Sequence, residues 1–202
     1  MIKKLLLIML LVALGITAVN LAVAADVPSA FKPFPVYSDA KSPDNHFSPS
    51  GWMGDYGDLK INDLCGDNPH SGSTCIQWKY SAKGSQGAGW AGCYWQNPAN
   101  NWGAKKGGFD LTGAKKLVFW ARGEKGGEII AEVGVGGITG KYADTDKVSS
   151  GPIALTKEWK KYEVDISKAD LSYISGGFFW VAKAEDEPEG GVTFYLDDIR
   201  YE

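Results

Sequence analysis

Short apolar runs with two-residue alternation recur along the chain, and turn-forming residues separate them. Gly, Pro, Asn and Asp mark the breaks, and the 202 residues include 26 glycines. Strand side chains alternate between two faces, whereas amphipathic helices need apolar residues three or four positions apart. Beyond the first 24 residues, no long stretch shows the helical spacing. The pattern therefore predicts an all-β fold made of short strands joined by tight turns.

About nine runs carry the strand pattern. In one of them Ile76, Trp78 and Tyr80 share a face, as expected for a strand with one side in a core. This number of short strands predicts an antiparallel β-sandwich, or jelly roll, formed by a single domain over residues 36–202. In chain order the nine runs are residues 36–39, 59–61, 75–80, 90–95, 116–122, 129–135, 159–166, 178–182 and 192–201.

The first 24 residues are organised like a secretory signal peptide. Lys3 and Lys4 precede an apolar run that ends at Leu21, and the sequence Ala-Val-Ala at residues 22–24 fits a cleavage site. Cleavage after Ala24 or Ala25 predicts a secreted or periplasmic protein, and an uncleaved membrane anchor is the alternative. Residues 25–35 are expected to form a leader or linker.

The charge of the processed chain argues against two classes of partner. Cleavage removes two of the 21 basic residues and none of the 24 acidic ones, which changes the net charge from −3 to −5. A mildly acidic exported protein is poorly suited to nucleic acid or to an anionic membrane surface. We therefore expect neither as a partner after cleavage.

Three cysteines lie within the predicted domain, and export to an oxidising compartment predicts a disulfide. Cys65 and Cys75 bracket the turn-rich segment GDNPHSGST, which favours their pairing. Cys93 then remains as a small buried apolar residue in a strand. A bond between Cys75 and Cys93 across neighbouring strands is the alternative.

The segment WAGCYWQNPANNW, from Trp90 to Trp102, sets aromatic rings among amides and turn formers. Flat rings stack on the C–H groups of a sugar, and amide side chains hydrogen-bond to its hydroxyls. Strand alternation divides the rings. Cys93 and Trp95 are expected to face the core, Trp90 and Tyr94 the opposite side, and Trp102 lies in a loop. The segment therefore predicts a sugar-binding surface.

Further residues complete the predicted ligand site. The amides beside the rings offer paired donors and acceptors, although Asn-Pro and Asn-Asn also form turns without any ligand. An arginine after an apolar strand and a loop tryptophan are added as candidates, whereas Trp78, Trp120 and Trp159 are expected in the core. The predicted ligand-binding set is Trp90, Tyr94, Trp102, Asn97, Gln96, Asn101, Arg122 and Trp52.

Six segments occur in a consistent order along the chain. They are VYSDA at 36–40, HSGSTCIQW at 70–78, FDLTGAKKLVFWARGE at 109–124, LTKEWKKYEVDIS at 155–167, GGFFW at 176–180 and FYLDDIRY at 194–201. This order resembles β-jelly-roll carbohydrate-binding modules of the galactose-binding-like superfamily. The resemblance implies a module that binds an oligo- or polysaccharide.

The same resemblance implies a metal site. Similar modules carry a structural Ca²⁺ between the first and last strands, held by carboxylate and backbone oxygens. By this resemblance, Asp39 and Asp197 are the expected ligands. Salt bridges to Arg200 or Lys41, or plain exposure, are the alternatives for these carboxylates.

A non-catalytic sugar-binding module fits these features best. The chain has only two histidines, His46 and His70, and no nucleophile or metal-binding motif. A jelly-roll glycoside hydrolase or polysaccharide lyase remains an alternative, with strand-borne acids such as Glu132, Glu163 and Asp165. An exported protein-interaction domain is a second alternative.

Overall fold

The structure is a computed structural model that describes residues 30–187 and 190–202, so the expected signal peptide lies outside the described residues. Those residues form thirteen strands and two short 3₁₀ turns, η1 (Tyr56–Asp58) and η2 (Ala184–Asp186). Every strand pair is antiparallel. The predicted all-β antiparallel sandwich of jelly-roll type is confirmed.

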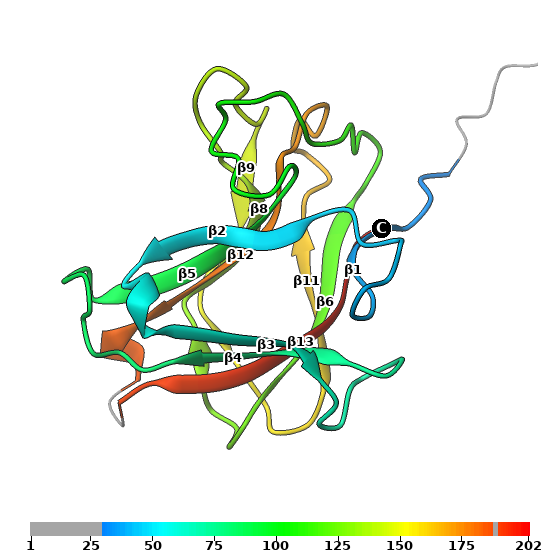
Figure 1. Cartoon of the computed structure of the whole chain (residues 1–202). Coiled ribbons are helices and arrows are strands. Elements are labelled where there is room, and N and C mark those ends of the chain that lie inside the picture. Colours follow the sequence, from blue (N-terminus) through cyan, green and yellow to red (C-terminus); the bar gives the residue numbers. More distant parts are fainter. Residues whose placement is uncertain (1–29, 188–189) are drawn as a thin grey trace, which may run out of the picture.

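Two sheets face each other across the core (Figure 1). In the first, sheet A, the strand order is β11-β6-β13-β4-β3, and β1 also pairs with β13. The last strand of the chain is therefore central in this sheet. The strands of sheet A are β1 (Phe34–Tyr37), β3 (Leu59–Cys65), β4 (Cys75–Tyr80), β6 (Lys116–Gly123), β11 (Lys160–Asp165) and β13 (Val192–Tyr201).

The second sheet, sheet B, has the order β2-β5-β12-β8-β9, and a separate two-stranded ladder pairs β7 with β10. The segment that contains Trp90 thus lies inside the sheet, with a hydrogen-bonded neighbour on each side. The strands are β2 (Ser48–Gly54), β5 (Trp90–Gln96), β7 (Ile129–Ile130), β8 (Glu132–Gly136), β9 (Lys147–Ser149), β10 (Ile153–Ala154) and β12 (Gly176–Lys183).

Tryptophans from both sheets form the centre of the core. Trp78 of β4 lies 5.8 Å from Trp95 of β5 and 5.0 Å from Trp180 of β12, measured between ring centroids. Trp78 meets both partners edge-on, and all three rings are fully buried. Edge-to-face packing is a favoured geometry for aromatic pairs. The contact joins sheet A to sheet B and confirms the inward faces predicted for β4 and β5.

The sequence pattern missed several strands that the structure shows. β2, β9 and β10 were not predicted, and the run 129–135 is split into β7 and β8. β2 has the sequence SPSGWMG, whose Pro, Ser and Gly suggest a loop. It lies at the edge of sheet B and its register shifts between Pro49 and Gly51, which are the conditions under which a strand tolerates proline.

The N-terminal part of the described chain joins the domain earlier than expected. β1 begins at Phe34, and Phe31 packs against the core, so the end of the expected linker is part of the sandwich. Among the described residues, no helix is long and apolar enough to cross a membrane.

The cysteines occupy two separate places. Cys65 and Cys75 are cross-strand partners on β3 and β4, both buried, and both are free thiols in the structure. Burial and the neighbouring Cys65 raise the pKa of the Cys75 thiol to about 12. Cys93 faces the core from sheet B, whereas Cys75 packs with Tyr195 outside that core. The alternative pairing of Cys75 with Cys93 across neighbouring strands is therefore wrong, because the two strands are not neighbours and Cys75 points away from the core that Cys93 faces.

We predict that the protein forms the Cys65–Cys75 disulfide when it folds in an oxidising compartment. Titration of the unreduced, denatured protein should then find one free thiol, that of Cys93, rather than three. Closing this short loop should raise the free energy of unfolding by roughly 2–3 kcal/mol. Reduction should remove this gain in the wild type but change nothing in the Cys65→Ser/Cys75→Ser variant. Three free thiols in protein from an oxidising compartment would contradict the prediction.

Candidate functional site

The outer face of sheet B carries part of the predicted aromatic surface. Cys93 and Trp95 lie in the core, so Trp90, Gly92 and Tyr94 point to the other side of β5, as the alternation predicted. Alternate residues of a strand are about 6.6 Å apart, which separates Trp90 from Tyr94 by about 13 Å. This outer surface along β5 is called the β5 face below.

The middle of the β5 face is flat because its central residue is a glycine. Gly92 pairs with Met53 of β2 on one side and with Val181 of β12 on the other. A Cβ at Gly92 would lie 2.4 Å from the backbone oxygen of Trp180 and 3.0 Å from the Met53 methyl group. Both flanking side chains are partly exposed. The result is a shallow apolar floor between two side chains that the sequence did not single out.

Aromatic rings stand at the two ends of this floor. The Trp90 ring packs over Gly54, where a Cβ would come within 2.9 Å of it. Trp102 is 46% exposed and lies edge-on to Tyr94, with 5.8 Å between ring centroids. Tyr94 itself is only 7% exposed, and its hydroxyl donates to the backbone oxygen of Gly136 over 3.0 Å. Trp90 and Trp102 therefore offer ring surface to a ligand, while Tyr94 supports Trp102 from below.

Charged side chains border the same face. Glu132 of β8 is the cross-strand partner of Val181 and forms an ion pair with Lys147 at 2.9 Å. Lys183 of β12 is the partner of Trp90 and pairs with Glu185 at 3.2 Å. The sequence could not place these groups beside Trp90, because their strands lie far from β5 along the chain. They are charged groups at the border of the β5 face.

The amides predicted to bind ligand instead hold their own loops. Gln96 is 1% exposed; its amide nitrogen donates to the backbone oxygen of Asn101, and its oxygen accepts from the Ser50 hydroxyl. Asn101 is 2% exposed and exchanges two hydrogen bonds with the backbone of Lys105. Asn97 bonds to the backbone of His46 and Gly108. These side chains have the turn-forming role that was the alternative to ligand binding.

Two other predicted site residues lie away from the β5 face. Trp52 of β2 is the cross-strand partner of Cys93 and packs edge-on against the core Trp78 at 5.5 Å, so it faces the edge of the core. Arg122 of β6 is 7% exposed on the outer face of sheet A, with its guanidinium 3.6 Å from the centre of the Tyr195 ring. Neither can share a ligand with Trp90 directly.

The prediction that Trp120 and Trp159 are core residues is wrong. Both are half-buried on the outer face of sheet A, beneath the loop that joins β3 to β4, residues 66–74. His70 of this loop stacks on Trp120 at 3.7 Å, and Trp159 donates from its indole nitrogen to the backbone oxygen of Asn68. An almost continuous apolar run such as β6 does not indicate which face is inward.

The two expected calcium ligands secure the same loop. The Asp197 carboxylate accepts backbone hydrogen bonds from His70 at 2.9 Å, from Ser71 at 3.3 Å and from Asp198 at 2.9 Å. The Asp39 carboxylate accepts from the backbone and hydroxyl of Ser73, from the Thr74 hydroxyl and from the backbone of Ala40.

This donor arrangement does not fit a calcium ion shared by Asp39 and Asp197. Both oxygens of Asp39 and Oδ2 of Asp197 already accept two hydrogen bonds each, and Oδ1 of Asp197 accepts one. A carboxylate oxygen has about two lone-pair sites, so almost none is left for a calcium ion, which needs six to eight oxygen ligands. Among the described residues, no group of three His, Cys, Asp or Glu side chains could hold a metal ion. The carboxylates act here as acceptors that fasten a loop to the first and last strands.

The fold that carries the β5 face is that of carbohydrate-binding modules with a β-jelly roll. A family 30 carbohydrate-binding module superposes with a TM-score of 0.58 at 14% identity, covering 84% of this chain and 87% of the other. The family 11 module of a cellulosomal cellulase from Clostridium thermocellum gives 0.56 at 15% identity, covering 86% and 95%. At this identity the similarity establishes the fold alone.

A third solved structure with this fold contains a sugar. It is the family 11 module from Clostridium thermocellum in complex with a β-1,3-1,4-mixed-linked tetrasaccharide, with a TM-score of 0.52 at 15% identity, covering 75% of this chain and 86% of the other. No protein-family model matches the chain. No curated protein matches its sequence either.

Burial of Asp197 predicts a pH dependence of stability. Burial raises its pKa from 3.8 to about 6. Between these values the native state binds more protons than the unfolded state, so this group's contribution to stability falls as the pH rises. Urea titrations measure the free energy of unfolding at each pH. Between pH 4 and pH 7 that of the wild type should fall by about 2–3 kcal/mol more than that of Asp197→Asn.

The exposed residue Asp63 provides the matched control for this measurement. Asp63→Asn also removes one carboxylate from sheet A, but at an exposed position. Its stability difference from the wild type should change little over the same range. A difference between wild type and Asp197→Asn that stays constant from pH 4 to pH 7 would contradict the assignment.

Proposed function

We propose that this chain is an exported, non-catalytic carbohydrate-binding module that holds an oligo- or polysaccharide on the β5 face. The observation that carries the proposal is the flat floor at Gly92, bordered by Met53 and Val181 and ended by Trp90 and Trp102. Such a surface suits the apolar faces of sugar rings. The jelly-roll fold shared with carbohydrate-binding modules supports the proposal.

The proposed binding mode combines stacking with hydrogen bonds from the border. Trp90 and Trp102 stack on sugar rings at the two ends of the floor. Glu132 accepts hydrogen bonds from hydroxyls, and Lys183 donates them. The floor itself belongs to β2, β5 and β12, which are held in one sheet, so little conformational entropy is lost when a ligand binds.

The arrangement of carboxylates favours binding over cleavage. Glycoside hydrolysis uses two carboxyl groups placed on either side of the scissile bond. Glu132 is the one acidic residue in the strands of sheet B, and Lys147 pairs with it. Glu163 and Asp165, the other acids considered for catalysis, lie on β11 in sheet A. Within the described strands no second carboxylate lies on the β5 face. Two loop carboxylates near it already have partners: Glu185 pairs with Lys183, and Asp144 accepts from the backbone nitrogens of Ile138 and Ser175.

Removing either end ring should weaken sugar binding without unfolding the protein. We expect Trp90→Ala and Trp102→Ala each to lower affinity about tenfold or more, since the contact of one ring is worth roughly 1.5 kcal/mol or more. Affinity electrophoresis through gels containing β-glucan, xylan, mannan or galactan measures the effect. Melting temperatures should show that both variants remain folded.

Trp159→Ala supplies the matched control, because it removes a half-buried tryptophan from the other sheet. Its retardation should equal that of the wild type. If the wild type is not retarded by any of the four polymers, the binding proposal fails. Release of reducing ends from any of them would replace it with the glycoside hydrolase alternative.

A further inference from the structure

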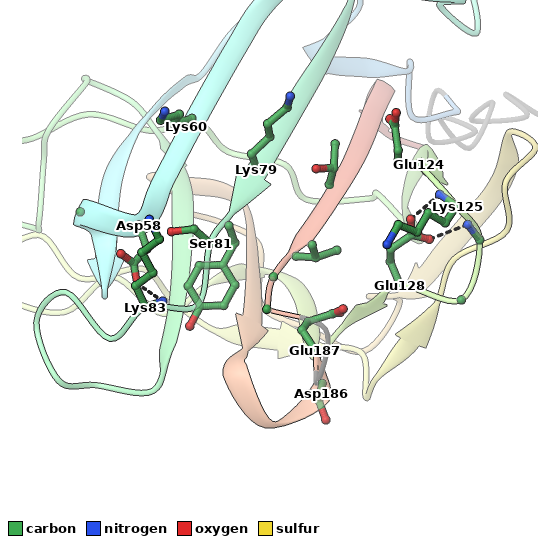
Figure 2. Close-up of a pocket in the computed structure, with 18 residues that line it drawn as sticks. Asp58, Lys60, Lys79, Ser81, Lys83, Glu124, Lys125, Glu128, Asp186 and Glu187 are labelled. Carbon is green, nitrogen blue, oxygen red and sulfur yellow. Dashed lines mark hydrogen bonds between the residues drawn. The ribbon is translucent and has the colours of Figure 1, made fainter.

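A cavity of about 920 Å³ opens at one end of sheet A, and none of the β5-face residues named above lines it (Figure 2). The last residues of β4, the first residues of β13 and the turn after β6 form its walls, together with residues of η1 and with Asp186 and Glu187. Its volume is within the range of small-ligand sites. The proposed sugar-binding face makes no use of this cavity.

One wall of the cavity carries lysines that form no ion pair with any acidic residue in the part of the chain that the structure describes. Lys60 and Lys79 are cross-strand partners on β3 and β4, and they point outward because Ile61 and Trp78 face the core. Within the described residues neither forms an ion pair, and nor does Lys83. Like charges directly opposite each other on paired strands destabilise a sheet. An anion bound between Lys60 and Lys79 would relieve that repulsion.

The wall across the cavity carries carboxylates that accept backbone hydrogen bonds. Glu128 accepts from the backbone nitrogens of Lys125 at 2.6 Å and Gly126 at 2.8 Å. Glu187 accepts from Ile129 at 2.9 Å. Figure 2 shows Lys60 and Lys79 on one side and Glu128 and Glu187 on the other. These bonds fix the carboxylates in place and leave lone pairs that can accept from further donors.

Two further residues add a hydroxyl group and a third carboxylate to the lining. Thr193 of β13 is the cross-strand partner of Lys79 and lines the cavity. Glu124, next to the turn, accepts a hydrogen bond from the Tyr195 hydroxyl. A simple anion would meet the lysines, but the opposite side carries Glu124, Glu128 and Glu187 against the single lysine Lys125, so the anion would be repelled there. A ligand with one anionic group and several hydroxyls satisfies both walls, because its hydroxyls donate to the carboxylates.

We propose that this cavity is a second binding site, which takes a saccharide bearing a carboxylate, such as a uronate. The carboxylate lies between Lys60 and Lys79, and the sugar hydroxyls face Thr193, Glu124 and Glu128. The saccharide part of this inference rests on the proposed function. The site itself is separate from the β5 face, so one molecule can hold a neutral and an acidic glycan at once.

The test compares one polymer with and without its charge. Affinity electrophoresis of the full chain uses polygalacturonate, its fully methyl-esterified form, alginate and hyaluronate. We expect at least one acidic polymer to retard the protein. If polygalacturonate does so, its methyl-esterified form should not. The Lys60→Ala/Lys79→Ala variant should bind acidic polymers at least tenfold more weakly. The double variant should keep or slightly raise the melting temperature, because it removes a repulsion.

Two control variants separate binding in the cavity from binding elsewhere on the protein. Lys115→Ala/Lys168→Ala removes the same charge at exposed positions away from the cavity and should bind acidic polymers like the wild type. Trp90→Ala should lose neutral-glycan binding and keep acidic-glycan binding. If inorganic phosphate at the same concentration of negative charge displaces the acidic polymers, the cavity binds simple anions. That result would overturn the saccharide assignment.

The outcomes also distinguish the two proposals from each other. Binding of neutral polymers without binding of any acidic polymer overturns the second site and leaves the β5 face intact. Acidic binding that Lys60→Ala/Lys79→Ala does not weaken also overturns it. Binding of acidic polymers alone, lost in that variant, supports the cavity and removes the proposed role of the β5 face.

Discussion

The contact of Trp78 with Trp95 and Trp180 is the interaction on which the rest of the structure depends. It joins the two sheets, and it fixes which residues of β4, β5 and β12 face inward. Because side chains alternate along a strand, burying Trp95 and Cys93 turns Trp90 and Gly92 outward. A shift of register by one residue would bury Trp90 and expose Trp95. The candidate sugar surface is therefore a consequence of the core.

The alternation of residues in the sequence was sufficient to assign the faces of a strand where its polar and apolar residues contrast. It assigned the faces of β4 and β5, and with them the outward direction of Trp90. It failed for Trp120 and Trp159, since alternation states which residues share a face but not which face is inward. In β6 both faces are apolar, because the loop 66–74 covers the outer one. Only the tertiary structure reveals such a cover.

Long-range polar partners were beyond the reach of the sequence. Gln96 accepts a hydrogen bond from Ser50, and Asp197 accepts from His70, 127 positions away. The register of β13 also shifts between Asp197 and Arg200, and Asp198 has a φ of +46°. Because of this irregularity both aspartates contact His70, whereas neighbouring residues of a regular strand point to opposite faces. A bulge of this kind has no clear signal in the residues themselves.

The sandwich gives the chain two outer surfaces of opposite character on one rigid core. The β5 face is mainly apolar and aromatic, and the cavity at sheet A is charged on both walls. Their residues share no hydrogen bond or ring contact among those described, and the packed core lies between the sheets. Substitutions at sites that share no partners have additive effects. Changes at Trp90 and at Lys79 should therefore act independently, and a measured coupling between them would mean that one glycan chain spans both surfaces.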